Sequence, residues 1–352
     1  MLAAIITAVA IYAVPEITVA QSTSCAPSGG LNFLCGVQAP EDLVLIPNTR
    51  WLIASGMMTG SGLHLIDTEA KQAKALFSAA VSTARPDKTK FADCPGPLDP
   101  KVAILHGLSL RQGQNGQYTL YATNHGGRES IEVFNVDSRA AIPSAVWTGC
   151  VLLPGKMAAN SVAAFNDGTL VATVLMLPDK TIDDIFAGRN TGVVLMWTPG
   201  SKEFRTLPGT ELSGDNGIET SPDNREFYVA ATGSKRIMAF SRADPSKALR
   251  SAQLQDFAPD NVRFVGNRLI TAGMIWDDPA CGGAPKKAVE WLQCPHGWIV
   301  DAVDPKTMTV TEIGRGPAAP PYSGTATAIP VGKDLWLSSF NSDRVAYTPL
   351  KR

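Results

Sequence analysis

Polar residues recur at one position in this chain, a few residues ahead of each of six similar turn-and-strand segments. These residues are Glu41, His106, Asn160, Asn216, Asn261 and Thr325. Carboxylates, amides and imidazoles bind metal ions or move protons, and five of the six residues carry such a group. If the six segments are equivalent units of one repeated structure, these side chains converge on one place.

The six segments share one pattern, a turn containing Asn, Asp or Gly followed by a strand-like run. They begin at Asn48, Asn115, Asn166, Asp223, Gly266 and Gly332. A mostly β repeat at a spacing of roughly 40–65 residues predicts an all-β fold, a six-bladed β-propeller, because one small sheet cannot bury both faces without neighbours. The innermost strands of a propeller line its central channel, so we expect the six polar residues at the axis.

The composition favours a small-molecule partner. The 352 residues carry a formal net charge of -1, with 18% charged and 45% hydrophobic residues. This balance has no electrostatic footprint of nucleic-acid binding. The repeat runs from about residue 40 to the end without a Pro/Gly/Ser-rich linker, so we expect a single domain over residues 21–352.

The first twenty residues are interpreted as a signal peptide. Leu2 to Val14 form an apolar run, and Thr18-Val19-Ala20 is a small-residue pattern that a signal peptidase could accept. The usual positive charge ahead of the run is missing, so a retained short anchor is the alternative. No other stretch approaches the ~20 apolar residues of a spanning helix. We expect a secreted or periplasmic protein without a transmembrane span in its mature chain.

The six cysteines are typical of an oxidising compartment, since they are even in number and contain no Cys-x-x-Cys pair. Cys281 and Cys294 bracket a loop rich in Gly and Pro, and we expect them to form a disulfide. Cys25 with Cys35 and Cys94 with Cys150 are one arrangement among the fifteen connectivities that six cysteines allow.

Oxygen donors dominate the expected axial set. This set comprises Glu41, Asn160, Asn216, Asp260 and Asn261. Calcium takes six to eight oxygens from carboxylates, amides and waters, whereas zinc favours His or Cys, so the set predicts a calcium site. The alternative for any one residue is a turn cap, but the shared blade position favours the metal.

Two histidines are candidates for proton transfer. His106 lies at the start of an inner strand, and His125 lies at the end of the strand that follows it. Adjacent antiparallel strands place these two ends side by side, and a pair of neutral imidazoles beside a cation could activate water. His64 and His296 occupy no axial position and are assigned no role.

These residues resemble the motifs of the paraoxonase/arylesterase family, within the wider propeller superfamily of senescence-marker protein, gluconolactonase and luciferin-regenerating enzyme. The matching segments are Ala39-Pro40-Glu41-Asp42-Leu43, His106-Gly107-Leu108-Ser109, Thr123-Asn124-His125, Asn216-Gly217-Ile218 and Asp260-Asn261. Taken in that order, the five segments resemble the family's N-terminal calcium motif, its His-Gly-Ile-Ser segment, its second histidine, its central blade and its Asp-Asn pair. The motifs occur in the same order in the family. The resemblance spans roughly residues 35 to 350.

The resemblance implies a calcium-dependent hydrolase of lactones that often also cleaves aryl esters. It implies that the axial oxygen set holds the catalytic calcium and that His106 and His125 form a catalytic dyad. The family's second, structural calcium maps to Asp42, the Leu108 carbonyl and Ser161, where Ser161 replaces a carboxylate, so we expect this ion to be weakly held or missing. In the family's vertebrate members a disulfide joins the N-terminal segment to the last strand. The last strand here, around Val345 to Leu350, contains no cysteine, so ring closure is expected to rest on strand pairing instead.

Two long insertions are predicted on the rim above the axial set. One runs from Asp277 to His296, and the other from Leu177 to Asn190 with a short helix near Ile182 to Phe186. Either could cover the site or be a surface loop.

Two other functions remain open. One is a non-catalytic, calcium-stabilised propeller that binds a small molecule or a protein. The other is a propeller similar to strictosidine synthase, which joins molecules rather than cleaving them. Nothing in the sequence indicates an oligomeric state or a particular lactone or ester.

Overall fold

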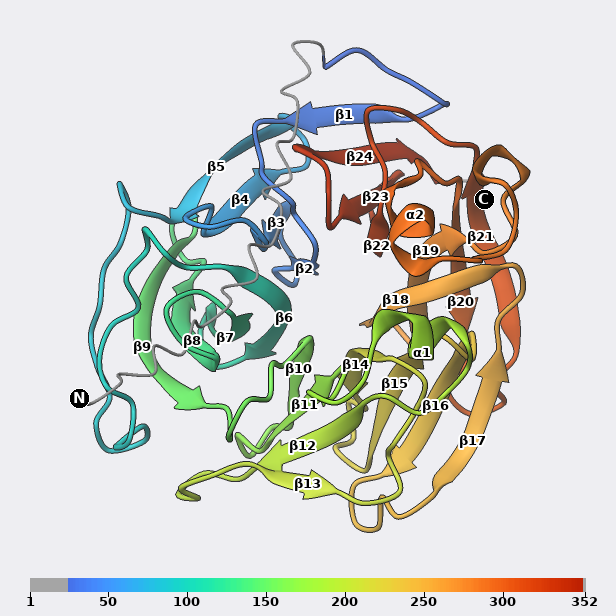
Figure 1. Ribbon diagram of the computed structural model, residues 1–352. Coiled ribbons are helices and arrows are strands. Elements are labelled where there is room, and N and C mark those ends of the chain that lie inside the picture. Colours follow the sequence, from blue (N-terminus) through green and yellow to red (C-terminus); the bar gives the residue numbers. More distant parts are fainter. Residues whose placement is uncertain (1–24, 351–352) are drawn as a thin grey trace, which may run out of the picture.

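The computed structural model describes residues 25–350 and has six four-stranded antiparallel sheets arranged around a central axis (Figure 1). The predicted six-bladed β-propeller is therefore confirmed. The predicted signal peptide, residues 1–20, lies outside the described residues. No helix within residues 25–350 is long and apolar enough to cross a membrane.

The blades follow one another along the chain, each running from its inner strand to its outer strand. Blade 1 contains β2 (Leu43–Leu45), β3 (Trp51–Ala54), β4 (Leu63–Asp67) and β5 (Gln72–Phe77). Blade 2 contains β6 (Leu105–Gln112), β7 (Gln117–Asn124), β8 (Ser130–Asp137) and β9 (Ser144–Leu152). Blade 3 contains β10 (Ser161–Ala164), β11 (Leu170–Val174), β12 (Val193–Trp197) and β13 (Arg205–Leu207).

The second half of the ring repeats this order until the last blade. Blade 4 contains β14 (Asp215–Thr220), β15 (Glu226–Ala231), β16 (Arg236–Ser241) and β17 (Ala248–Gln253). Blade 5 contains β18 (Phe257–Val265), β19 (Arg268–Ile275), β20 (Trp298–Val303) and β21 (Val310–Gly316). Blade 6 contains β22 (Thr325–Val331), β23 (Asp334–Ser339), β24 (Arg344–Pro349) and, from the N-terminal segment, β1 (Asn32–Cys35).

Strand pairing closes the ring, as the sequence predicted. β1 pairs antiparallel with β24, with Asn32 opposite Tyr347 and Cys35 opposite Arg344. The segment from the start of the chain thus completes the last blade and places the first blade beside it. The Cys25–Cys35 disulfide fixes the chain ahead of β1, with 6.0 Å between the two Cα atoms.

The hydrophobic core is divided among the spaces between neighbouring blades. Six apolar clusters each join residues of two consecutive blades. Phe134 and Trp147 of blade 2, for example, belong to the cluster shared with blade 1. Each blade therefore buries both of its faces only because it has neighbours, which is why the pattern repeats around the ring.

The six predicted turns share a backbone conformation that explains their composition. Asn48, Asn115 and Asn224 have φ values of 60°, 53° and 63°. Asn tolerates this left-handed region better than most residues, because its short side chain bonds locally to the backbone. The turns set the inner strand and the second strand of each blade in register.

The inner strands carry bulges where the candidate site residues lie. The register shifts fall between Leu105 and Leu108, Asp215 and Ile218, and Pro259 and Val262. A bulge re-aims side chains that a regular ladder would place on alternate faces. His106, Asn216, Asp260 and Asn261 all lie within these shifts.

Glycines in two of these bulges allow neighbouring inner strands to approach closely. A Cβ atom on Gly107 would lie 2.5 Å from the Ser161 Cα, and one on Gly217 would lie 2.5 Å from the Asn261 Cα. Any larger residue would push the next blade outward, so the glycine beside each site residue keeps the axial ring narrow.

Candidate metal and catalytic site

The structure brings the five predicted calcium ligands together at one end of the axis. Glu41 and Asn160 lie just ahead of β2 and β10, whereas Asn216, Asp260 and Asn261 lie in the bulges of β14 and β18. Four of the five are buried, with exposed fractions of 1% for Glu41 and Asn261, 7% for Asn216 and 8% for Asn160. Their shared blade position therefore results in a shared place in space.

Four buried oxygen atoms in this ring lack a hydrogen-bond donor among the described residues. They are Glu41 Oε2, Asn160 Oδ1, Asn216 Oδ1 and Asn261 Oδ1. A buried acceptor without a partner costs about 1–3 kcal/mol, and native proteins contain few of them. All four are oxygens, the ligand type that calcium binds, and the Asp260 carboxylate and waters would complete its six to eight ligands, so the residues present fit this ion.

The amide nitrogens of the ring are bonded so that the oxygens stay free. Asn216 Nδ2 donates to Thr232 Oγ1 at 3.1 Å, and Asn261 Nδ2 donates to Glu41 Oε1 at 2.5 Å. These two of the three amides are held through their nitrogens, and their oxygens are left unbonded.

Hydroxyl groups hold the backbone of the same residues. Thr123 donates to the carbonyl of Asn160, Thr173 to that of Asn216, Thr271 to that of Asn261, and Ser338 to that of Glu41. These hydroxyls come from second strands, in three of the four cases from the preceding blade. They lock the ring to the rigid sheets, and they were not predicted from the sequence.

The carboxylates of the ring lie in an environment that disfavours their charge. Burial, followed by the neighbouring charge of Asp42, raises the pKa of Glu41 well above its usual range. Burial, followed by the charges of Glu41 and Asp42, likewise raises the pKa of Asp260. A divalent cation at this point would favour both charged forms and reverse both shifts.

The two predicted histidines form a relay that ends on a carboxylate. His106 Nδ1 lies 3.0 Å from His125 Nε2, and His125 Nδ1 lies 2.9 Å from Glu129 Oε2. The other ring nitrogen of His106, Nε2, lies 3.5 Å from Glu41 Oε2. The relay therefore runs from a partly exposed carboxylate inward to the oxygen ring, and Glu129 is a member that sequence reasoning missed.

The carboxylate fixes the tautomer of each imidazole. Because Glu129 only accepts when ionised, His125 carries its proton on Nδ1 and accepts at Nε2 from His106 Nδ1–H. His106 Nε2 then keeps a lone pair that faces the ring. Burial lowers the pKa of His106 to about 4, so the imidazole is neutral and able to accept a proton at neutral pH.

A small cavity lies directly above the ring, between polar and apolar walls. Its volume is about 190 Å³, and Glu41, His106, Asn160, Asn216 and Asp260 form its polar wall. Met57, Met274, Phe186, Trp291, Leu292 and Phe340 contribute to the apolar wall. Met57 and Met274 thus face the candidate site.

Both predicted insertions cover this cavity, and each contains a helix. α1 (Ile182–Phe186) lies where the sequence predicted it, whereas α2 (Ala288–Gln293) was not predicted. Asp183 Oδ1 of α1 accepts the backbone N–H of Ala288 at 3.0 Å, and the Phe186 ring packs edge-on against Trp291 at 5.2 Å. We call these two helices the lid.

A disulfide and a histidine support the second lid helix. The predicted Cys281–Cys294 disulfide is present, as are Cys25–Cys35 and Cys94–Cys150. His296 Nε2 lies 2.8 Å from the Trp291 carbonyl. Cys281, Cys294 and His296 lie close together in the manner of a metal site, but the disulfide occupies both sulfurs.

Asp42 and Leu108, the residues mapped to a second calcium, come together around an arginine instead. The guanidinium of Arg263 donates to Asp42 Oδ2 and, at 2.8 Å, to the Leu108 carbonyl. The third mapped residue, Ser161, offers a buried hydroxyl without a charge. A positively charged side chain already binds the oxygens that a cation would need, so this set does not fit a second metal ion.

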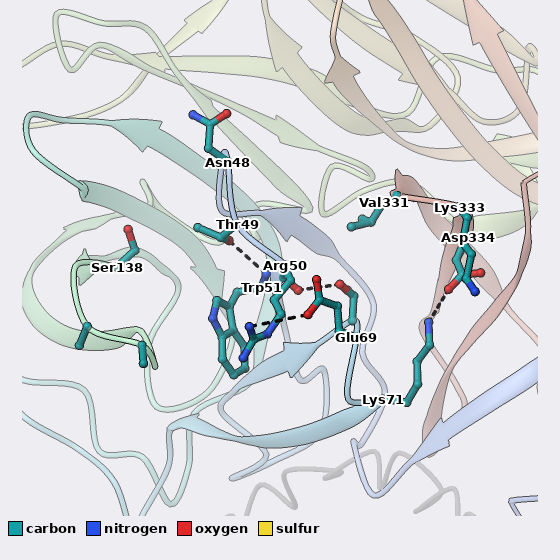
Figure 2. A pocket seen from close by; sticks show the side chains of 14 residues that line it. Asn48, Thr49, Arg50, Trp51, Glu69, Lys71, Ser138, Val331, Lys333 and Asp334 are labelled. Carbon is teal, nitrogen blue, oxygen red and sulfur yellow. Dashed lines mark hydrogen bonds and ion pairs between the residues drawn. The ribbon is translucent and has the colours of Figure 1, made fainter.

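A larger cavity lies around the turns at the other end of the blades and lacks this chemistry. It measures about 820 Å³, and Asn48, Arg50, Lys71 and Lys333 are among its lining residues (Figure 2). Two of its cations are paired, because Arg50 lies 2.9 Å from Asp67 and Lys71 bonds to Asp334. Its wide opening and paired charges favour a solvated surface hollow.

Solved structures of other propellers resemble this fold. A luciferin-regenerating enzyme aligns over 92% of this chain and 97% of its own with a TM-score of 0.52 and 13% identity. Regucalcin from Agrobacterium tumefaciens, described as a calcium-binding protein, aligns over 92% of this chain and 95% of its own with a TM-score of 0.52 and 12% identity. At these identities the likeness shows the propeller fold alone. No family model and no curated protein sequence matches the chain.

Proposed function

We propose that this chain is an exported, calcium-dependent hydrolase of lactones and aryl esters, similar to the paraoxonase/arylesterase family. The observation that carries the proposal is the ring of four unpaired buried oxygens beside a histidine relay, under an apolar lid. A calcium ion held by Glu41, Asn160, Asn216, Asp260 and Asn261 would act as a Lewis acid on the substrate carbonyl.

The residues of the chain supply the proton transfers. His106 Nε2 accepts a proton as the water oxygen attacks the carbonyl carbon. His125 accepts a hydrogen bond from His106 Nδ1–H, and Glu129 stabilises the positive charge that develops on the pair. When the carbonyl carbon–oxygen single bond breaks, His106 returns the proton to the leaving oxygen, so the products are a carboxylic acid and an alcohol.

The lid defines the substrate environment. Phe186, Trp291 and Phe340 give the 190 Å³ cavity an apolar wall opposite the polar ring. This division suits a substrate with one carbonyl group and an aliphatic or aromatic remainder. Excluding water from the cavity also strengthens the electrostatic interactions within it.

The three disulfides support the proposed export. Their sulfurs are paired throughout the described residues. Disulfides of this kind persist in oxidising compartments, and we place the mature chain in the periplasm or outside the cell.

Substitution of the relay separates an enzyme from a non-catalytic binding propeller. His106→Gln should lower kcat for a δ-lactone by about 10²- to 10⁴-fold, the usual contribution of a general base, and should leave calcium affinity and fold unchanged. His64→Gln is the matched control, because His64 is a histidine of β4 away from the ring. Full activity in His106→Gln would refute the proposed mechanism. Calcium binding without hydrolysis in the wild type would favour the binding propeller.

A further inference from the structure

Arg263 is a buried cation on the propeller axis, directly beneath the oxygen ring. It lies on β18, two residues after Asn261, and its exposed fraction is 5%. A permanently charged side chain is rarely buried to this extent unless it is paired. The groups that accept hydrogen bonds from Arg263 therefore indicate its structural role at the axis.

The guanidinium contacts three blades other than its own. It donates to Asp42 at the start of blade 1, to the Leu108 carbonyl of blade 2 at 2.8 Å, and to the Ile218 carbonyl of blade 4 at 3.3 Å. Arg263 joins inner strands from opposite sides of the ring through one charged group.

Asp42 is held so that it faces this charge. Its Oδ1 accepts from Thr327 Oγ1 of blade 6 at 2.7 Å, and its Oδ2 accepts from the Leu108 backbone N–H at 2.7 Å as well as from Arg263. Every hydrogen bond of this carboxylate is thus directed to the inner strands. The Asp42 carboxylate and the Arg263 guanidinium form the centre of a network that joins their own two blades to three others.

We infer that Arg263 replaces a second metal ion. The guanidinium, a charge that belongs to the chain itself, holds the inner strands together around Asp42 and Leu108, and divalent ions bind only in the oxygen ring above it. A guanidinium presents five donors in a plane and cannot lose its proton, so it can bind several oxygens at once as a cation does. It cannot be removed by a chelator. The inference concerns Asp42 and Leu108 and does not require the proposed hydrolase activity.

Metal stoichiometry in the wild-type protein is the primary test. Terbium luminescence and calcium titration calorimetry should give one site per chain, and Glu41→Gln should abolish that site. Two sites per chain in the wild type would overturn the inference. So would an ion that survives Glu41→Gln and is lost in Asp42→Asn. No site at all would refute the proposed calcium site, but it would support the absence of an ion at Asp42.

Removing the arginine tests the structural role separately. Arg263→Met should lower the Tm measured in chelator by about 5 °C or more, because it leaves a buried carboxylate without its partner. The matched control is Arg250→Met, since Arg250 also pairs with a carboxylate, Glu226, and contacts the Pro305 carbonyl, but lies away from the axis. A smaller drop in Arg263→Met than in Arg250→Met would contradict the inference.

A second variant reverses the proposed replacement. Combining Arg263→Ala with Ser161→Asp returns a second carboxylate and vacates the space of the guanidinium. We expect this double variant to gain a second calcium site and a calcium-dependent rise in Tm. If it folds with one site only, the position is not equivalent to a metal site and the inference fails. If it does not fold, the wild-type stoichiometry and the Arg263→Met comparison still decide.

Discussion

Removal of the Glu129 carboxylate should impair catalysis without affecting the fold. In the structure Glu129 accepts from His125 Nδ1 at 2.9 Å, and this bond assigns the protons of both imidazoles. In Glu129→Ala, His125 can instead carry its proton on Nε2 and donate to His106 Nδ1. His106 would then carry its own proton on Nε2, facing the ring, and could not act as a base.

The size of the effect follows from the bond that is lost. A hydrogen bond to a charged group contributes about 1.5–3 kcal/mol, and the side chains of His125 and Glu129 are 24% and 36% exposed, which favours the lower half of that range. Because 1.36 kcal/mol is a factor of ten, the active tautomer should become about 10- to 50-fold less populated relative to the inactive one. We expect kcat to fall by a similar factor, and KM and calcium affinity to stay unchanged.

Steady-state kinetics with a δ-lactone, together with urea unfolding, test this reasoning. The free energy of unfolding should fall by no more than about 2 kcal/mol, because the bond that is lost is this same partly exposed one. Glu69→Ala is the control, because Glu69 forms an ion pair with Arg50 at the other end of the blades. A Glu129→Ala variant with wild-type kcat would show that the relay does not set the tautomer of His106.

Three further predictions concern pH and the lid. Burial, followed by the charge of Glu312, raises the pKa of Asp301 to about 7, so the folded state favours the protonated acid and loses stability as pH rises from about 4 to 7. Asp301→Asn should remove this loss. At pH 8 the variant should be more stable than the wild type by up to about 4 kcal/mol, as measured by urea unfolding, whereas at pH 4 the two proteins should be equally stable. An equal difference at both pH values would contradict this prediction. Because burial lowers the pKa of His106 to about 4 and a nearby calcium ion would lower it further, the acid limb of kcat/KM at saturating calcium should lie at or below about pH 4, and a limb near 6.5 would contradict the assignment. Trp291→Ala should raise KM for phenyl acetate about 10-fold and for γ-butyrolactone much less, since Trp291 forms part of the apolar wall; equal changes for both substrates would argue against substrate contact by the lid.

The fold was predictable because the signal repeats. Each turn at Asn48, Asn115 and Asn166 is short and common, but repetition with a polar residue ahead of each turn indicates equivalent units. That equivalence also placed Glu41 and Asn216 at one point in space, although they are 175 residues apart in the numbering of the sequence. In a repeated architecture, a short local pattern therefore predicts which residues lie close together in space.

Residues whose partners come from other blades were not predictable. Arg263 follows Asn261 by two positions, and its charge alone is typical of an exposed strand residue. Its role depends on Asp42 and Leu108, which reach it from the far side of the axis. Glu129 was missed for a related reason, because its distance from His125 depends on the turn between β7 and β8.

The lid was only partly predictable. The helix at Ile182–Phe186 begins with a capping box formed by Thr181 and Asp184, a signal that the sequence contains. The helix at Ala288–Gln293 has no side-chain cap and lies in a Gly- and Pro-rich insertion, so its local signals are weak. Its position depends on packing of Trp291 against α1 and on the Cys281–Cys294 disulfide.

The most direct test of the central claim is hydrolysis by the purified mature protein of γ- and δ-lactones and phenyl acetate, before and after removal of calcium by a chelator. We predict turnover that disappears with the chelator and returns when calcium is added, while the fold persists. Turnover that is unaffected by complete calcium removal would contradict the account, as would an intact, calcium-loaded protein that hydrolyses none of these substrates.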